Sequence, residues 1–512
     1  MGPYQVMALA WVLCAAWIAF VIFTNKKAHP KALFYLFFVE MWERFSYYGM
    51  RALLVLYMTS EIINGSEKSG LGYDDGSAYG VYGAYGALVY LTPILGGLIA
   101  DKLTGYRKAI MWGAILMALG HLAMAIPSLF FPALALLILG NGFFKPNISS
   151  LIGKLYPEGD PRRDGGFTIF YMGINIGAFL TGLTCGTIGE LEGWHYGFSL
   201  AGVGMVVGLI VFWFAQRNGV LGEHGYPPEE AKGKKIAGLP VNMAVYIGSF
   251  LILPLIIFMV KKNDIVDIFL GVVGTGVLGY LLWLASSYDK VAKQRIWVIM
   301  ALLFFTTLFW SFFELAGSAL TVFTKNNVIR EIAGVELTAA NYQSFNPLFI
   351  MLFAPIFAWL WVKLSKANFE PPAPVKFAAG LMLLGVGFLV LQLGKGAAVA
   401  GAIPGIFMVG LYLFHTLGEL TLSPVGLSMV TKLSPAKIVG FVMGTWFLSS
   451  SIAHQAGKHI AKMTTIEGNP SPEESLDLCL AVFNQLGFIA IGAGVLLLLI
   501  SPILNKWMHG IK

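Results

Sequence analysis

Residues 37–51 read FFVEMWERFSYYGMR, and this stretch decides the fold because it puts four charged residues into a run otherwise apolar enough to cross a membrane. At 3.6 residues per turn, its polar side chains share one face of a helix. They are Glu40, Glu43, Arg44, Tyr47, Tyr48 and Arg51. Charged groups at bilayer depth cost about 2.5–3.5 kcal/mol each, so they normally face a bundle interior or a water-filled path. The stripe therefore indicates a substrate or proton pathway, and a purely structural ion-pair cluster is the alternative.

Composition agrees with a membrane environment. Of 512 residues, 57% are hydrophobic and only 12% are charged, and the mean hydropathy is +0.74, far from the averages of a soluble domain. The net charge of +7 comes from basic residues scattered over short loops, which argues against a nucleic-acid partner. The three cysteines are too widely spaced for a disulfide framework or a metal motif.

Apolar segments long enough to span a bilayer recur along the whole chain. We predict an all-α polytopic membrane protein with fifteen helices near 5–24, 32–59, 77–100, 107–126, 131–153, 165–188, 196–216, 241–260, 265–287, 295–323, 342–362, 375–393, 402–431, 438–463 and 480–504. The first segment lacks a basic n-region and a small-residue cleavage site, so we expect a retained helix rather than a signal peptide.

The positions of Lys and Arg predict the orientation, because basic residues concentrate in cytoplasmic loops. Of the 34 basic residues, 23 fall on one side and 8, including Lys458, on the other. The remaining three, Arg44, Arg51 and Lys145, lie within predicted spans. We therefore expect a multi-pass protein of the cell membrane whose C-terminus is cytoplasmic and whose N-terminus lies outside.

An internal repeat indicates two related halves. Five residues recur at an offset of 278: Gly140, Pro146, Lys154, Leu155 and Pro157 match Gly418, Pro424, Lys432, Leu433 and Pro435. Trp42 and Gly49 recur as Trp310 and Gly317 at an offset of 268. This pattern predicts the major facilitator fold. We divide the chain into an extra N-terminal helix and linker (1–31), a six-helix bundle (32–217), a linker with two inserted helices (218–294) and a second bundle (295–512).

Three motifs carry a resemblance to a known family. They are residues 40–49 (EMWERFSYYG), 166–175 (GFTIFYMGIN) and 312–318 (FFELAGS). Together they resemble the proton-dependent oligopeptide transporter family, in its bacterial form with two extra helices between the halves. Residues 96–108 further resemble the loop signature of the major facilitator superfamily, with Lys102 where an Arg is usual. The resemblance implies a proton-coupled symporter that imports di- and tripeptides by alternating access.

Two intramembrane ion pairs can be anticipated from the residues. Lys145 and Glu419 occupy nearly equivalent positions in the two halves, and neither would stay charged in hydrocarbon without a partner or water. Glu314 is the only acid of its helix, and Arg51 is its best candidate partner. We expect both pairs to act as gates that open when substrate binds. Permanent bridges are the alternative.

A short peptide is a zwitterion, so its site needs a cation, an anion with amide oxygens, and tolerant pockets. We assign Arg51 and Lys145 to the substrate carboxylate, and Glu419, Asn175 and Asn346 to its ammonium group. The pocket lining of Tyr47, Tyr48, Tyr90 and Trp446 is implied by the resemblance, most of all for Tyr90 and Trp446. Proton coupling is assigned to Glu40, Glu43, Arg44 and Glu314.

Other functional classes are less consistent with the sequence. No nucleophile motif, metal cluster or P-loop is present, which argues against an enzyme. His121, His415 and His454 have no metal spacing, and we expect them to pack. We expect no cofactor other than the coupling proton, membrane lipid as surroundings, and a monomer. A transporter of nitrate, amino acids or drugs, a channel, and a transporter-like sensor remain alternatives.

Overall fold

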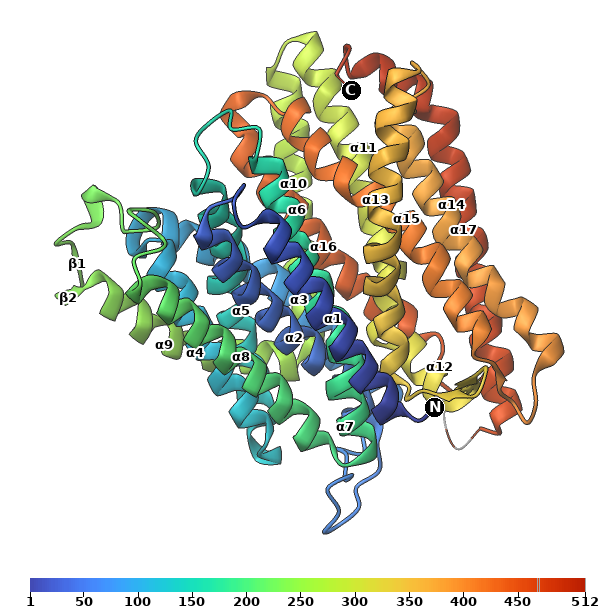
Figure 1. The fold of residues 1–512 in the computed structure, drawn as a ribbon. Coiled ribbons are helices and arrows are strands. Elements are labelled where there is room, and N and C mark those ends of the chain that lie inside the picture. The colour runs from blue at the N-terminus through green and yellow to red at the C-terminus, as the bar shows by residue number, and fades with distance from the viewer. Residues whose placement is uncertain (467, 469, 512) are drawn as a thin grey trace. The chain divides into compact units, whose positions relative to one another are not determined.

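The structure, a computed structural model, describes residues 1–466, 468 and 470–511, and it is almost entirely helical (Figure 1). Within these residues, 13 helical segments are long and apolar enough to cross a membrane. Two further helices, α2 (Lys31–Thr59) and α4 (Tyr106–Met124), fall outside that set because of their charged residues. All fifteen predicted segments are therefore helical, and the all-α fold class is confirmed.

Several of the predicted N-terminal helices are longer than expected or interrupted. The remaining helices up to residue 287 are α1 (Pro3–Asn25), α3 (Asp75–Ile99), α5 (Phe130–Lys154), α6 (Arg163–Thr181), α7 (Thr187–Leu191), α8 (Trp194–Arg217), α9 (Val241–Lys261) and α10 (Asn263–Ser287). A π-helical turn, Gly182–Gly186, joins α6 to α7. The single predicted helix at 165–188 is thus one span with an irregular turn inside it.

The C-terminal part contains a similar interruption. Its helices are α11 (Lys290–Phe313), α12 (Ala319–Asn327), α13 (Phe345–Lys366), α14 (Ala373–Leu393), α15 (Ile406–Leu433), α16 (Val439–Lys462) and α17 (Pro472–Trp507). A 3₁₀ turn, Glu314–Gly317, separates α11 from α12. This break lies at the predicted proton carrier Glu314.

Strands are confined to two-residue pieces in loops. β1 (Lys235–Ile236) pairs antiparallel with β2 (Leu239–Pro240), and β3 (Val328–Ile329) pairs parallel with β6 (Ile403–Pro404). β4 (Glu331–Ile332) and β5 (Val335–Glu336) complete the set in the described residues. None was predicted, because each is too short to leave a periodic sequence signal.

The chain forms two compact units. The first comprises residues 1–74, 88–263 and 335–347, and the second comprises 75–87, 264–334 and 348–512. The two inserted helices therefore belong to different units. Helix α9 packs on α5 in the first unit, whereas α10 belongs to the second. The domain boundaries predicted at 31, 217 and 294 stay predictions.

The first unit is assembled around α2, which packs against α6 and α8, while α4 packs against α5 and α8. Glycine permits the closest approach. A Cβ atom on Gly177 of α6 would lie 2.2 Å from the carbonyl oxygen of Met41 on α2. Because real Cβ atoms never approach so closely, only glycine lets α6 lie directly on the charged turn of α2.

The extra helix α1 is fastened to the same unit by aromatic and polar contacts. Trp11 Nε1 donates to Thr184 Oγ1 at 2.9 Å, and the Trp11 ring lies 6.0 Å from the ring of Trp42 on α2. Its other face carries exposed apolar side chains such as Val12 and Phe23. One face of α1 is thus suited to protein and the other to lipid.

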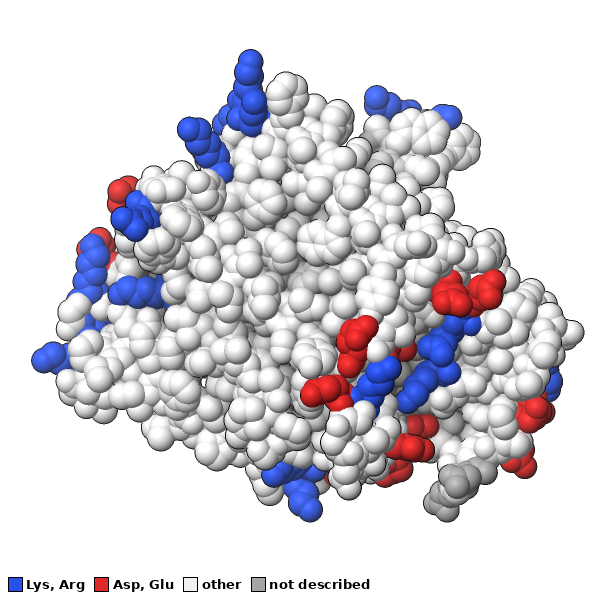
Figure 2. All heavy atoms as spheres, turned by 60° about the horizontal axis from the view of Figure 1, so that its bottom comes forward, with Lys and Arg blue, Asp and Glu red and all other residues white. Residues whose placement is uncertain are grey.

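In the second unit, α14 packs between α15 and α17, and α11 packs against α16. Exposed large apolar side chains occur on the outward faces of both units, for example Leu251, Val272, Trp359 and Leu499. Figure 2 shows Lys, Arg, Asp and Glu in small groups separated by wide uncharged areas on the face in view. Such a surface is typical of a protein that lies in a bilayer.

We expect Gly177→Ala to destabilise the protein, because the added methyl group must push α6 away from α2. Overpacking of this kind costs about 1–3 kcal/mol. The measurement is thermal unfolding of detergent-solubilised protein, followed by size-exclusion chromatography. Gly271→Ala is the matched control, since a Cβ there meets no atom within 4 Å. Equal unfolding temperatures for the two variants would contradict the close packing of α2 and α6.

Candidate functional site

The predicted charged stripe on α2 is buried. Glu40, Glu43 and Arg44 are each at most 3% exposed. Arg44 Nε lies 2.5 Å from Glu43 Oε2 and 3.1 Å from Glu40 Oε1, so one guanidinium group bridges two carboxylates. Removing one partner of such a pair costs about 3–5 kcal/mol, because an uncompensated charge is left in a low-dielectric interior.

Helix α5 supplies the other side of this cluster. Asn141 Nδ2 donates to Glu43 Oε1 at 3.4 Å. One turn later Lys145, half-buried, lies within electrostatic range of both Glu40 and Glu43. Its Nζ also lies 4.4 Å from the centre of the Tyr90 ring on α3. Two acids and two bases thus lie in one group.

Tyrosine rings lie beside both arginines of the stripe. The Arg44 guanidinium lies 5.2 Å from the centre of the Tyr47 ring, and that of Arg51 lies 5.6 Å from the Tyr48 ring. The two tyrosine rings are 5.2 Å apart. Cation–π contacts stabilise a cation without neutralising it.

The hydrogen bonding of this cluster is incomplete. Within the described part of the chain, Glu40 Oε2 and Arg44 Nη2 are buried and have no hydrogen-bond partner. Buried polar groups are normally satisfied, and exceptions concentrate at functional sites. The cluster is therefore better suited to exchanging partners, or to holding a proton or water, than to a static structural role.

The second unit positions the other predicted residues. Glu314 begins the 3₁₀ turn after α11 and is 7% exposed. Glu419 lies half-buried on α15. Trp446 of α16 is buried against α15, where a Cβ on Gly426 would lie 2.3 Å from its ring. The backbone therefore departs from regular α-helical geometry at Glu314.

Two of the ten predicted site residues of the first unit are amides, and their roles stay predictions. Asn175 is buried, but its Nδ2 donates to the Tyr171 carbonyl of its own helix at 2.9 Å. Asn346 is half-buried at the start of α13. The predicted pairs Arg51–Glu314 and Lys145–Glu419 each join residues of different units, so they stay predictions.

The structure also brings together polar residues that the sequence had not assigned to a site. The partly exposed Asp267 of the inserted helix α10 lies 2.5 Å from the buried amine of Lys458 on α16, an ion pair that no sequence pattern had predicted. Lys458 had been counted with an outer loop. Among the histidines, His121 accepts or donates a 2.5 Å hydrogen bond with Ser46 and packs as expected, whereas His454 lies 3.9 Å from Glu314.

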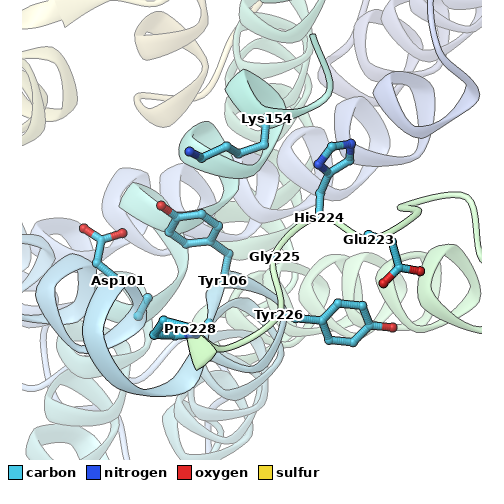
Figure 3. A pocket seen from close by; sticks show the side chains of 10 residues that line it. Asp101, Tyr106, Lys154, Glu223, His224, Gly225, Tyr226 and Pro228 are labelled. Atoms are coloured by element: carbon cyan, nitrogen blue, oxygen red, sulfur yellow. The ribbon is translucent and has the colours of Figure 1, made fainter. Parts of the chain in front are cut away.

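A separate hollow lies where α3, α4 and α5 meet the segment after α8. Its volume is about 320 Å³, and Figure 3 shows its lining of Ala100, Asp101, Gly105, Tyr106, Lys154, Glu223, His224, Gly225, Tyr226 and Pro228. Its residues 100–106 belong to the segment 96–108, which resembles the superfamily loop signature. Acidic and basic side chains are mixed in it, so it has no clear preference for an ion of one sign.

Arg107 fastens this loop to the segment after α8. Its Nε donates to the His224 carbonyl at 2.6 Å and its Nη2 donates to the Gly222 carbonyl. The guanidinium also lies 4.0 Å from the centre of the Tyr226 ring. Because Arg107 is buried and its guanidinium group is bonded to backbone carbonyls, it ties residues 222–226 to the start of α4.

The fold and the buried charges together define a multi-pass membrane transporter. Residues 107–471 match the sequence profile described as POT family. The chain belongs to the POT family, as the motifs at 40–49, 166–175 and 312–318 had indicated. The expected major facilitator architecture is confirmed by its solved relatives.

Named relatives agree with this assignment. The chain is 38% identical to an uncharacterized transporter, YclF, of Bacillus subtilis over 94% of this chain and 96% of that protein. It is 34% identical to the peptide transporter YePEPT of Yersinia enterocolitica, over 93% and 94% of the two chains. A crystal structure of peptide transporter POT in complex with sulfate superimposes with a TM-score of 0.81 at 38% identity, covering 94% of this chain and 96% of that one.

We expect Arg107→Lys to loosen residues 222–226, because lysine cannot reach two carbonyl groups and stack on Tyr226 at once. Hydrogen–deuterium exchange of the backbone in this segment should rise by roughly tenfold or more, equivalent to about 1.4 kcal/mol. Arg217→Lys, at an exposed position just before the segment, is the control. Unchanged exchange in Arg107→Lys would show that the segment is held by other contacts.

Proposed function

We propose that this protein is a proton-coupled symporter that imports di- and tripeptides by alternating access. The observation that carries the proposal is the buried group of Glu40, Glu43 and Arg44, which faces Lys145 of α5. Its carboxylates can take up protons, and the neighbouring cations can bind a carboxylate ligand. The relatives supply the substrate class, since several are named di- or tripeptide transporters.

The chemistry of a short peptide matches the residues available. Arg51 and Lys145 offer cations for the peptide carboxylate, each beside a tyrosine ring that leaves its charge intact. Glu419 and the amide oxygens of Asn175 and Asn346 suit the peptide ammonium. Tyr47, Tyr48, Tyr90 and Trp446 would line pockets for side chains of varied size. A related crystal structure contains alafosfalin.

The energetics of coupling to protons are sufficient. One proton that moves down about 100 mV gains about 2.3 kcal/mol, and one pH unit adds about 1.4 kcal/mol. A total of about 3.7 kcal/mol supports roughly 500-fold accumulation of a neutral zwitterion. Rocking of two related halves around a site near the bilayer midplane would convert this gradient into uptake.

The proposal extends to location and partners. We place the C-terminus and the loops rich in Lys and Arg in the cytoplasm, and the N-terminus outside the cell membrane. The protein would act as a monomer surrounded by lipid, without a cofactor other than the coupling proton and without chemical turnover of the peptide.

A transporter of another small molecule is the second candidate. It is favoured by one relative at 31% identity whose crystal structure contains 5-aminolevulinic acid. Uptake of a labelled dipeptide into proteoliposomes with an imposed pH gradient distinguishes the two. Unlabelled tripeptide should compete, whereas nitrate and free amino acids should not. Competition by amino acids without competition by tripeptide would transfer the proposal to the second candidate.

We expect Arg51→Ala and Lys145→Ala to weaken peptide uptake, because each removes a cation offered to the carboxylate. The loss should be roughly tenfold or more for a free peptide acid, since charge-assisted hydrogen bonds are worth about 1.5–3 kcal/mol. A peptide amidated at its C-terminus should lose less. Lys68→Ala, at an exposed loop position, is the control. Equal losses for both peptides would exclude these residues from carboxylate binding.

We expect Glu43→Gln to separate binding from coupling. The amide cannot ionise, so the Arg44 bridge can no longer respond to protons, and accumulation driven by a pH gradient should fall by roughly tenfold or more. The dissociation constant for peptide, measured by calorimetry, should change little. Glu61→Gln, on an exposed residue just after α2, is the matched control. A large rise in the dissociation constant with accumulation preserved would contradict this role.

A further inference from the structure

Lys458 of α16 has a side chain with no exposed surface, yet it carries an amine. Its Nζ lies 2.5 Å from Asp267 Oδ2 and 3.6 Å from Asp264 Oδ1, both in the first turns of α10. Asp264 is 86% exposed, so the group of Lys458 with its two aspartates is in contact with solvent at Asp264. His459 Nε2, also near solvent, lies 3.1 Å from Asp267 Oδ1.

His454 lies one helical turn before Lys458 on the same face of α16. Its ring is buried, and its Nε2 lies 3.9 Å from Glu314 Oε1. The order along this face is therefore Asp267, Lys458, His454 and Glu314, from the exposed start of α10 to the buried turn after α11. All four belong to the second unit.

Helix α3 leaves room for this row of residues by presenting glycines to it. A Cβ on Gly83 would lie 2.6 Å from Lys458 Cβ, and a Cβ on Gly86 would lie 2.5 Å from His454 Nδ1. Gly83 and Gly86 are three residues apart and so share one helix face. Gly83 thus makes room for Lys458 and Gly86 for the ring of His454, so α3 packs directly on this row.

We propose that His454 is the group through which Glu314 exchanges protons with the solvent at the start of α10, and that the Lys458–Asp267 pair sets the affinity of His454 for the proton. This inference rests on the proton-coupled function proposed above. A hydronium ion protonates His454 and leaves as water. Once the two side chains close from 3.9 Å to hydrogen-bond distance, the Nε2–H bond of the imidazolium breaks as an O–H bond forms on the Glu314 carboxylate. The products are a neutral imidazole and a neutral carboxylic acid.

The electrostatics follow from the groups that face His454. These are Glu314 from the 3₁₀ turn, Tyr82 from α3 at 6.5 Å between ring centres, and Lys458 from its own helix. Asp264 and Asp267 of α10 and then His459 lie beyond Lys458, and α15 contacts α16 earlier, at Trp446. A bare lysine one turn away would disfavour the imidazolium, and Asp267 offsets that charge.

Under the orientation proposed above, the start of α10 lies on the outer side of the membrane, where the proton concentration is higher. A route from this end reaches Glu314 through residues of the second unit alone. The inserted helix α10 would then have a function, because its Asp264 and Asp267 form the end of the proton route that is open to solvent.

The test uses full-length protein in liposomes, with peptide uptake measured as a function of external pH and peptide counterflow measured without a gradient. His454→Gln should lower gradient-driven uptake by roughly tenfold or more and leave counterflow near the wild-type rate. Lys458→Met should move the midpoint of the pH profile up by about one unit, and Asp267→Asn should move it down by a similar amount. His459→Gln should leave the midpoint in place.

Opposite shifts for the lysine and aspartate variants are the decisive sign, because loss of a structural tie would lower both rates without moving the midpoint in two directions. If His454→Gln does not fold, the test uses variants of the partly exposed Asp267 instead. Asp267→Asn should shift the midpoint of the pH profile, and Asp267→Glu should restore the wild-type midpoint. A wild-type midpoint in both His454→Gln and Asp267→Asn would overturn the route. Absence of gradient-driven uptake by the wild-type protein would instead overturn the proposed symport.

Discussion

The bridge from Arg44 to Glu40 and Glu43 is the interaction on which the rest of the first unit depends. Charges buried at membrane depth are tolerated only when they are paired. The surrounding helices must therefore close over α2 tightly enough to exclude lipid from the charges. The approach of Gly177 to Met41 provides this closure on one side, and Asn141 of α5 supplies a polar contact on the other.

The same requirement explains why the two units differ in their polar content. In the first unit the charges balance locally, since Lys145 lies near the two acids of α2. In the second unit Glu314 has His454 as its near neighbour, and the cation Lys458 is compensated by acids of α10. These buried charges thus have neighbours of opposite charge within the same unit.

Membership of the POT family places these features in context. The motifs that carry the resemblance are the same residues that the structure buries: residues 40–49 form the charged turn of α2, and 312–318 contain the break at Glu314. Features outside these three motifs, such as the Arg107 contacts with residues 222–226 and the ion pair of α10 with α16, add further connections between helices.

The sequence by itself determined the number and approximate extent of the membrane-spanning segments and the burial of the stripe on α2. Hydrophobic length and helical periodicity are local properties of the sequence. A charged residue within an apolar run must face the protein interior or water, so its burial can also be predicted locally. Only the tertiary structure decided which residues on different helices meet. The neighbours of Lys458 and His454 come from α3, α10 and the turn after α11, more than a hundred residues away in the chain for most of them. No local pattern encodes such a meeting, because it depends on how whole helices pack and on where glycines let them approach.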